Sequence, residues 1–435
     1  MNKGSAAALV AVISFLVYNA NGREIGSYDS QPAKFLAIEI ATRGSLSLGR
    51  VVGRIPLLAD RPAFAVDRRG NYRSAYPLPS ALAAGGVAWV LSKTHALDLS
   101  APRAPARVAK LTASALTALT IAFALLAGVR RTTVPQAIVL ALALALGTNL
   151  WAAVSQTLWQ QETALCGLMG AVWLLGAPNG TLGRVLAAGA LLGIAAAARP
   201  QVAPAVAILA ASMVVRWGRR GAIGIAPIAL AAIAVVAINI TWFGHPLGAV
   251  PKLEALHPEY HGLSGSFQWQ PWIGAAGLLV SPSRGLLIFS PIVAFAAFGL
   301  AHTRREGWRS DLAWCAAAAA AQMTLYSFYG VWWGGHTFGP RSALDALPML
   351  VPVAAAALPA ILASRVLRWT AAACLAWSIA AAAAGAFIYP AEVWNTDPAD
   401  VDRAHDRLWE WRDSQLERCA RAPWSPQNFA LLSDD

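Results

Sequence analysis

The chain is divided into apolar blocks of roughly 17–22 residues, the length that a helix needs to cross ~30 Å of hydrocarbon. Inside lipid every backbone amide must be paired within its own segment, so these blocks predict helices. The alternating polarity of a transmembrane barrel strand is not found. With 57% hydrophobic and only 13% charged residues among 435, the composition agrees. The predicted fold class is an all-α polytopic membrane protein.

We predict about eleven membrane crossings. The first block, near residues 4–20, follows Lys3 and is short enough to be a cleaved signal peptide. Ten further blocks and a poor cleavage site favour a retained signal-anchor helix. Residues 1–389 would then form one transmembrane domain, followed by an external C-terminal tail at 390–435. The later spans are expected near residues 108–129, 133–150, 159–177, 183–199, 202–217, 221–242, 285–302, 311–329, 342–364 and 369–389.

The net charge of +12 could suggest a nucleic-acid partner, but the position of the arginines argues against one. They cluster in every second connection between blocks, as expected for loops that stay inside the cell. Topology and contact with anionic membrane lipids explain these clusters. The same register places segments 21–105 and 243–284, and the tail, outside. The arginines concerned are Arg130, Arg131, Arg184, Arg216, Arg219, Arg220, Arg304, Arg305, Arg309, Arg365 and Arg368.

The first external loop is far longer than an ordinary connection. Its segment Ala33–Arg43 (AKFLAIEIATR) is mainly apolar with charged residues on one side, which predicts a helix lying in the membrane interface. The stretch Leu78–Leu91 is short and rich in glycine, so we interpret it as re-entrant or interfacial. If it crossed the membrane, every later orientation would invert.

The four cysteines predict neither a disulfide framework nor a zinc site. Cys166, Cys315 and Cys374 lie in apolar blocks, and Cys419 is expected in an exposed tail. No histidine and cysteine pattern with zinc spacing occurs, so no metal ligand is predicted.

Asp29 is the candidate catalytic residue. It lies just outside the first span, within Tyr28-Asp29-Ser30-Gln31-Pro32, near the depth of the lipid headgroups. A carboxylate there could act as a general base toward an attacking hydroxyl. The alternative is a turn or a helix cap. Other carboxylates share this loop: Glu24, Glu39, Asp60, Asp67 and Asp98.

Arg284 is the first candidate for binding a phosphate. It enters the span expected at 285–302, where both the helix dipole and the positive-inside trend disfavour a cation. An anionic partner would explain it, and helix N-terminal amides with a guanidinium suit a phosphate. The alternative partner is a carboxylate of a loop.

Arg341 is the second candidate, at the end of the outer segment Trp332–Arg341 (WWGGHTFGPR). The tryptophans suit the membrane interface or a sugar face. His336 could donate to a phosphate or a sugar. Asp345 follows Arg341 by one helical turn, so an ion pair between them is the alternative.

Arg199 is the third candidate phosphate ligand, in the outer turn Ala198–Gln201. It stands at a helix C-terminus, where a cation is already favourable, so a structural role competes. The outer turn Trp151–Glu162 could also line a cavity. The predicted cavity residues are Tyr28, Tyr76, Gln156, Trp159, Trp333 and His336.

These features together resemble the GT-C superfamily of membrane glycosyltransferases, which includes protein O-mannosyltransferases and the bacterial aminoarabinose lipid A transferase. Bacterial GT-C-like proteins carry SPxRGLLxFSP and WWGGxxxGPR stretches, matched here by Ser281–Pro291 and Trp332–Arg341. Similar patterns lie at Leu150–Gln160, at Arg199-Pro200, at Phe243–Leu247 and in the tail at Trp394–Gln415. The resemblance covers nearly the whole chain.

The resemblance implies an inverting transfer of a sugar from a polyprenyl-phosphate donor to a glycan, lipid or protein acceptor. Asp29 matches the family's first-loop catalytic aspartate, and Arg284 and Arg341 would stabilise the phosphate leaving group. Many relatives have a second acidic residue where this chain has Ser30, so no cofactor is predicted and a divalent metal is left open. The expected place is the bacterial inner membrane, with the site on the periplasmic side. A lipid or polysaccharide transporter and a non-catalytic subunit of an envelope glycan assembly are the alternatives.

Overall fold

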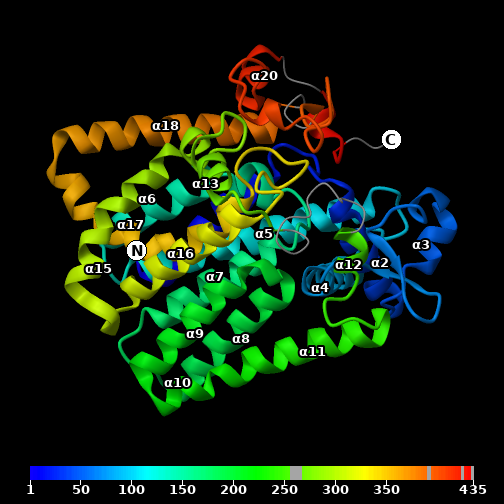
Figure 1. Cartoon of the computed structure of the whole chain (residues 1–435), viewed down its shortest axis with the longest axis horizontal. Coiled ribbons are helices and arrows are strands. Elements are labelled where there is room, and N and C mark those ends of the chain that lie inside the picture. The colour runs from blue at the N-terminus through cyan, green and yellow to red at the C-terminus, as the bar shows by residue number, and fades with distance from the viewer. Residues whose placement is uncertain (255–266, 389–392, 423–425, 433–435) are drawn as a thin grey trace.

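The structure is a computed structural model that describes residues 1–254, 267–388, 393–422 and 426–432. Helices dominate it, and one antiparallel hairpin joins β1 (Phe64–Val66) to β2 (Tyr72–Ser74). The long helices run side by side, the first external loop gathers at one end of them, and the C-terminal segment packs beside the end of α18 (Figure 1). The all-α class predicted from the sequence is therefore confirmed apart from this small hairpin.

In the described part of the chain, five helical segments are long and apolar enough to cross a membrane. They make this a multi-pass membrane protein; the number eleven stays a prediction. These five are α5 (Ala104–Gly128), Pro200–Trp217 with α9 (Ala203–Trp217), Arg219–Phe243 with α10 (Arg219–Ile223) and α11 (Ile225–Phe243), Ser342–Ala363 with α17 (Leu347–Ala363), and α18 (Arg365–Phe387). Shorter apolar helices are α1 (Lys3–Asn19), α6 (Val134–Leu146), α7 (Gln161–Leu175), α8 (Leu182–Ala198) and α13 (Pro271–Val280).

Glycines let several of these helices approach closely. A Cβ on Gly189 of α8 would lie 1.9 Å from the carbonyl oxygen of Gly224, between α10 and α11. Such small residues are typical of helix contacts in membranes. Lipid gives no hydrophobic force that brings helices together, so their association depends on close packing. By contrast, α11 has no buried residue along its length, although it is highly apolar. Its exposed side chains are those expected to face lipid.

Residues 285–302 do not form the single helix that we predicted. They are divided into α14 (Leu286–Phe289), a 3-10 helix (Pro291–Gly299) and α15 (Leu300–Glu306). Pro291 has no amide hydrogen and disfavours helical backbone at Ser290, which is non-helical with φ −138° and ψ 61°. The 3-10 helix lies so close to α17 that a Cβ on Gly299 would meet the Val353 carbonyl oxygen at 1.9 Å.

The connections that we assigned to the inside meet at one end of the bundle. Arg131, after α5, pairs with Glu306 at 2.9 Å and with Asp311 at 2.7 Å. Asp311 begins α16 (Asp311–Phe328), and a 3-10 helix (Gly307–Arg309) precedes it. At the opposite end, the amide of Leu431 donates to the Gly22 carbonyl at 2.8 Å. The connection after α5 and the one before α16 therefore lie together, as predicted, and which end faces the inside stays a prediction.

The first external loop folds into a unit with its own apolar core. Leu36, Leu48 and Phe64 are buried there against Val108 of α5 and Leu158. The two segments predicted to be interfacial, Ala33–Arg43 and Leu78–Leu91, are both helical. Their helices pack on each other, and Gly85 lies against Ile40. Its elements are the 3-10 helices Tyr28–Ser30 and Pro56–Leu58, α2 (Gln31–Arg43), α3 (Gly49–Arg54), the hairpin and α4 (Pro79–Lys93).

The described C-terminal residues are folded against the bundle. Cys419, which we expected in an exposed tail, is 5% exposed and packs with Phe289 and Phe338, so that expectation is wrong. The remaining elements are a π-helix (Leu150–Val154), α12 (Val250–Glu254), α20 (Gln415–Arg421) and the 3-10 helices His405–Leu408 and Pro426–Phe429.

The inner and outer ends can be assigned by cysteine labelling. Ser100, in the first external loop, and Asn179, between α7 and α8, are both exposed. We expect an impermeant maleimide to label Ser100→Cys in intact cells and Asn179→Cys only after permeabilisation. The reverse pattern would invert the topology and remove the site below from the outer face.

Candidate functional site

Asp29 lies at the end of the bundle that carries the first long loop, which we predicted to face outside and call the outer end. It belongs to the short 3-10 helix before α2, and its side chain is exposed. Its Oδ1 accepts a hydrogen bond from the Tyr76 hydroxyl at 2.7 Å. The cap of this turn is Ser27, whose side chain accepts from the Asp29 amide, so the Asp29 carboxylate is not used as a cap. Burial, together with the negative charge of Asp29, raises the pKa of Tyr76 well above its ordinary value. The phenol therefore stays protonated and donates to the carboxylate.

Tyr28 presents its ring beside Asp29 and is 52% exposed. The Arg61 guanidinium covers one face of the ring at 4.0 Å from its centroid and donates to the hydroxyl at 3.3 Å. We did not predict Arg61 as a site residue from the sequence. Nothing in its local sequence marks it, because the contact depends on how the first loop folds.

Arg341 is half-buried and stacks on the Trp159 ring, 4.1 Å from its centroid. It donates to Gln161 Oε1 at 3.3 Å and weakly to the Gly334 carbonyl at 3.5 Å. No carboxylate forms a salt bridge with it in the described ranges, so the expected alternative, an ion pair with Asp345, is not formed. Burial and the charge of Arg199 lower the pKa of Arg341, and the charge of Asp29 opposes this change.

Asp345 is paired with Arg199 instead. Its Oδ2 lies 2.6 Å from Arg199 Nε, and Tyr326 of α16 donates to the same oxygen. Arg199 also donates to the Tyr326 hydroxyl at 2.8 Å, and Gln161 donates to Asp345 Oδ1 at 2.6 Å. This buried group of charges is balanced internally. The structural alternative for Arg199 is thus the one whose contacts are formed.

Arg284 is 1% exposed, and each of its five N–H groups has a protein acceptor. A phosphate could reach its guanidinium only by displacing them. The predicted helix N-terminus is also weak, because α14 has only four residues. The phosphate role of Arg284 stays a prediction, and these contacts argue against it. The acceptors are the carbonyl oxygens of Ser283 (2.9 Å), Trp333 (3.0 Å) and Gly335 (3.2 Å) and the side chains of Gln415 (2.7 Å) and Asn395 (2.8 Å).

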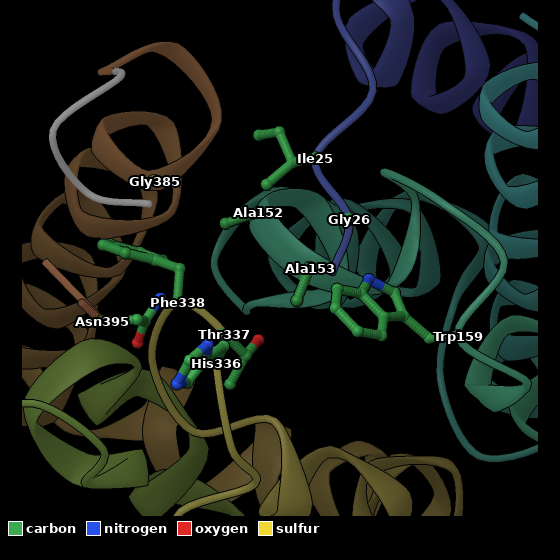
Figure 2. A pocket seen from close by; sticks show the side chains of 10 residues that line it. All are labelled: Ile25, Gly26, Ala152, Ala153, Trp159, His336, Thr337, Phe338, Gly385 and Asn395. Carbon is green, nitrogen blue, oxygen red and sulfur yellow. The ribbon is translucent and has the colours of Figure 1, made fainter. Parts of the chain in front are cut away.

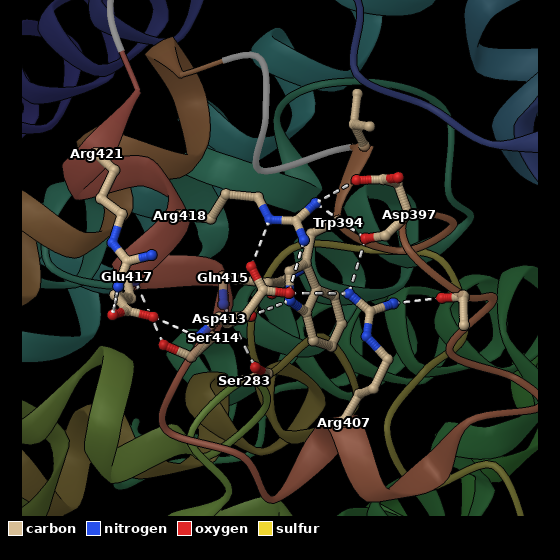
Figure 3. Close-up of polar contacts among 12 residues, drawn as sticks. Ser283, Trp394, Asp397, Arg407, Asp413, Ser414, Gln415, Glu417, Arg418 and Arg421 are labelled. Atoms are coloured by element: carbon tan, nitrogen blue, oxygen red, sulfur yellow. Dashed lines mark hydrogen bonds and ion pairs between the residues drawn. The ribbon is translucent and has the colours of Figure 1, made fainter.

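The C-terminal segment is built around Trp394, whose ring is in contact with two guanidinium groups, those of Arg284 and Arg407. Figure 3 shows Trp394 and Arg407. Arg284 is 5.2 Å and Arg407 4.4 Å from its centroid. Its indole N–H donates to the Asp413 carbonyl at 2.5 Å, and Arg418 pairs with the Asp413 carboxylate at 2.6 Å. The described part of the tail is therefore folded. The motif at Trp394–Gln415 did not predict these contacts.

Gln415 connects the tail to the outer loop after α16. Its Oε1 accepts from the Gly339 amide at 2.9 Å as well as from Arg284, and its Nε2 donates to the Thr337 carbonyl at 2.9 Å. A small cavity of about 20 Å³ lies against this loop (Figure 2). Trp159, His336 and Asn395 are among its lining residues. It has room for about one water molecule.

Two predicted cavity residues lie elsewhere. Gln156 is fully buried, where its Oε1 accepts from Lys110 of α5 and from Asn21. Trp333 is 3% exposed, and its indole N–H donates to Asp402 Oδ1 at 2.7 Å. The structure therefore brings together Asp29, Tyr28 and Tyr76 at one place, and Trp159 and His336 at the cavity.

His336 faces two carboxylates of the tail, Asp400 at 2.9 Å and Asp402 at 3.4 Å. Partial burial acts to raise the pKa of Asp400, but hydrogen bonds from His336 and from the Asp402 amide lower it overall. From the sequence we predicted His336 as a donor to a phosphate or a sugar and predicted no metal ligand.

No protein-family model and no curated protein matches the sequence. Among solved structures, the fold is similar to the archaeal oligosaccharyltransferase AglB from Archaeoglobus fulgidus, solved with an inhibitory peptide and a dolichol-phosphate, with a TM-score of 0.52 and 11% identity. The alignment covers 96% of this chain and 61% of AglB, so this chain spans about three fifths of that protein's length. ArnT from Cupriavidus metallidurans, bound to undecaprenyl phosphate, aligns with a TM-score of 0.45 and 14% identity over 98% of this chain and 76% of that one. The likeness to AglB supports the expected GT-C-like fold.

Loss of the Arg284 contacts should destabilise the outer region. We expect Arg284→Ala to reduce the free energy of unfolding by about 3 kcal/mol or more, because buried acceptors lose a charged donor. Arg284→Lys should recover only part of this, since an ammonium group lacks the planar fork. Both should speed tryptic cleavage within residues 393–422.

Glu410→Gln, an exposed position in the same segment that leaves every tryptic site intact, is the matched control and should behave like the wild type. Melting temperature, cleavage rate and polyprenyl-phosphate affinity are measured together. Weaker lipid binding at an unchanged melting temperature would restore the phosphate role of Arg284.

Proposed function

We propose that this protein is a membrane glycosyltransferase that moves a sugar from a polyprenyl-phosphate donor to an acceptor hydroxyl at the outer face. The observation that carries the proposal is the pairing of Asp29 with Tyr76 at the outer end, within electrostatic reach of Arg341. The GT-C-like fold supports it. The proposal is supported by a candidate base and a candidate phosphate ligand that lie close enough for their charges to interact.

Asp29 would act as the general base. The acceptor oxygen attacks the anomeric carbon of the donor, the bond from that carbon to the phosphate oxygen breaks, and Asp29 takes the acceptor proton. Attack opposite the leaving group inverts the anomeric configuration. Tyr76 holds Oδ1 through its hydroxyl, which orients the carboxylate and leaves Oδ2 to face the acceptor.

Arg341 would stabilise the phosphate that leaves. Its guanidinium is held in place by stacking on Trp159 but has no carboxylate partner in the part of the chain that the structure describes. A preorganised cation beside a leaving group that gains negative charge is typically worth a few kcal/mol. Arg199 is less suited, because Asp345 already neutralises it.

A transporter or flippase would be expected to have ionisable residues deep in its spans. The buried Lys110 lies in the second turn of α5, beside Asn21 and Gln156 near the outer end. It therefore gives no support to a transport path. The proposed setting is the bacterial inner membrane with a periplasmic site, and the acceptor is a glycan, a lipid or a protein.

Replacing Asp29 tests the base. Asp29→Asn keeps an oxygen for Tyr76, so the melting temperature should stay within about 2 °C while transfer falls by about 10²-fold or more. The assay is release of polyprenyl phosphate from polyprenyl-phosphate sugars in proteoliposomes. Asp98→Asn, an exposed acid of the same loop, should keep full activity. Equal rates for Asp29→Asn and the wild type would exclude Asp29 from the reaction.

Replacing Arg341 tests the phosphate ligand. We expect Arg341→Gln to weaken undecaprenyl-phosphate binding by about tenfold or more, equal to about 1.4 kcal/mol. Arg341→Lys keeps the charge but loses the planar stack on Trp159, so it should lie in between. Arg54→Gln, an exposed arginine of the first loop, is the control. A lowered melting point with unchanged lipid affinity would assign Arg341 a structural role.

A further inference from the structure

We propose that His336, Asp400 and Asp402 bind one divalent transition-metal ion of the Zn²⁺ or Mn²⁺ kind. His336 comes from the outer loop after α16, and the two aspartates come from the C-terminal segment. One ligand atom from each residue lies within 4.8 Å of the others. The proposal concerns ion binding and does not depend on the transferase function proposed above.

Two distances within the cluster, both from His336, match those between ligands around such an ion. With metal–ligand bonds of about 2.1 Å, two ligands lie about 3.0 Å apart at a right angle and about 3.4 Å apart at a tetrahedral angle. His336 Nε2 lies 2.9 Å from Asp400 Oδ1 and 3.4 Å from Asp402 Oδ2. An ion could therefore bind His336 with either carboxylate at the distances present, and binding all three atoms requires the two carboxylates to lie within about 4.2 Å of each other.

A buried group outside the cluster orients one of the carboxylates. Trp333, whose side chain is fixed by burial, donates its indole N–H to Asp402 Oδ1, and Oδ2 of the same carboxylate faces His336. Metal-binding side chains are commonly held in this way by hydrogen bonds from a second layer of residues. The Asp402 side chain is thus held with one oxygen toward the imidazole.

The donor set favours a particular kind of ion. An imidazole with two carboxylates offers mixed nitrogen and oxygen ligands, which suit Zn²⁺ and Mn²⁺. Ca²⁺ prefers six to eight oxygens, and Mg²⁺ keeps most of its water. The two carboxylates balance the charge of the ion. The ion would replace the hydrogen bond between His336 and Asp400. Because metal ligands must be deprotonated, binding should weaken as the pH falls.

Metal binding here would connect two chain segments next to the cavity. His336 and Asn395, one from each segment, both line it (Figure 2). Arg284 already joins the same two segments through Gly335 and Asn395. The ion would add a second connection, so it should also protect the tail from proteolysis.

The test is metal titration of the full-length protein in detergent after removal of metal with EDTA. Calorimetry with ZnCl₂ and spin resonance with MnCl₂ should each show one ion per chain, bound more weakly at pH 5.5 than at pH 7.5. We expect His336→Ala and Asp402→Asn to weaken the affinity at least tenfold. Asp406→Asn, an exposed acid of the same segment outside the cluster, should bind like the wild type. Zn²⁺ should slow tryptic cleavage of the tail in the wild type but not in His336→Ala.

Asp402→Asn retains an oxygen for Trp333 and is the variant to rely on if His336→Ala does not fold. Melting temperatures of metal-free samples check this. Absence of saturable binding to the wild type would overturn the proposal. Stoichiometric binding that both variants retain would place the ion elsewhere and would also overturn it.

Discussion

The outer end of this protein depends on one guanidinium group. The chain leaves regular helix at Ser283 and at Trp333–Gly335, where backbone carbonyls lack helical partners. In the tail, Asn395 and Gln415 present buried side-chain oxygens. Buried polar groups without partners are costly, so such segments need a donor with several N–H groups in one plane. Arg284 supplies five, and it joins three segments that are far apart in the sequence. This explains why an arginine stands where helix dipole and topology both disfavour one.

Much of the fold could be predicted because lipid permits few solutions. The length of the apolar blocks predicted the five long helical segments that are found. The arginine clusters predicted that the connection after α5 and the one before α16 share an end, where Arg131 contacts Glu306 and Asp311. The break at Pro291 was readable in principle, since a proline inside a span disfavours continuous helix. The folded tail was not, because its packing depends on long-range contacts such as that of Gln415 with the Gly339 amide.

The candidate site was predicted less completely. Local sequence drew attention to Asp29 and Arg341, and the ion-pair partner that it suggested for Arg341 was Asp345. It could not show that Asp345 turns to Arg199, a residue 146 positions away in the chain. Arg61 and the two tail aspartates were missed for the same reason. Spacing along one helix predicts contacts within a turn, and these contacts are all between separate segments.

The three arginines predicted to bind phosphate differ in the protein groups that already contact their guanidinium groups. Arg284 donates every N–H to a protein acceptor, and Arg199 shares the buried carboxylate of Asp345. If Arg284 turned to a ligand, its buried acceptors would lose their donor. If Arg199 did so, the buried carboxylate of Asp345 would lose its cation, and such losses cost several kcal/mol. Arg341 is held by an aromatic ring and two neutral acceptors, so an incoming phosphate would add a counter-charge without breaking an ion pair. The pairing of Arg199 with Asp345 is therefore what leaves Arg341 available to an anionic ligand near Asp29.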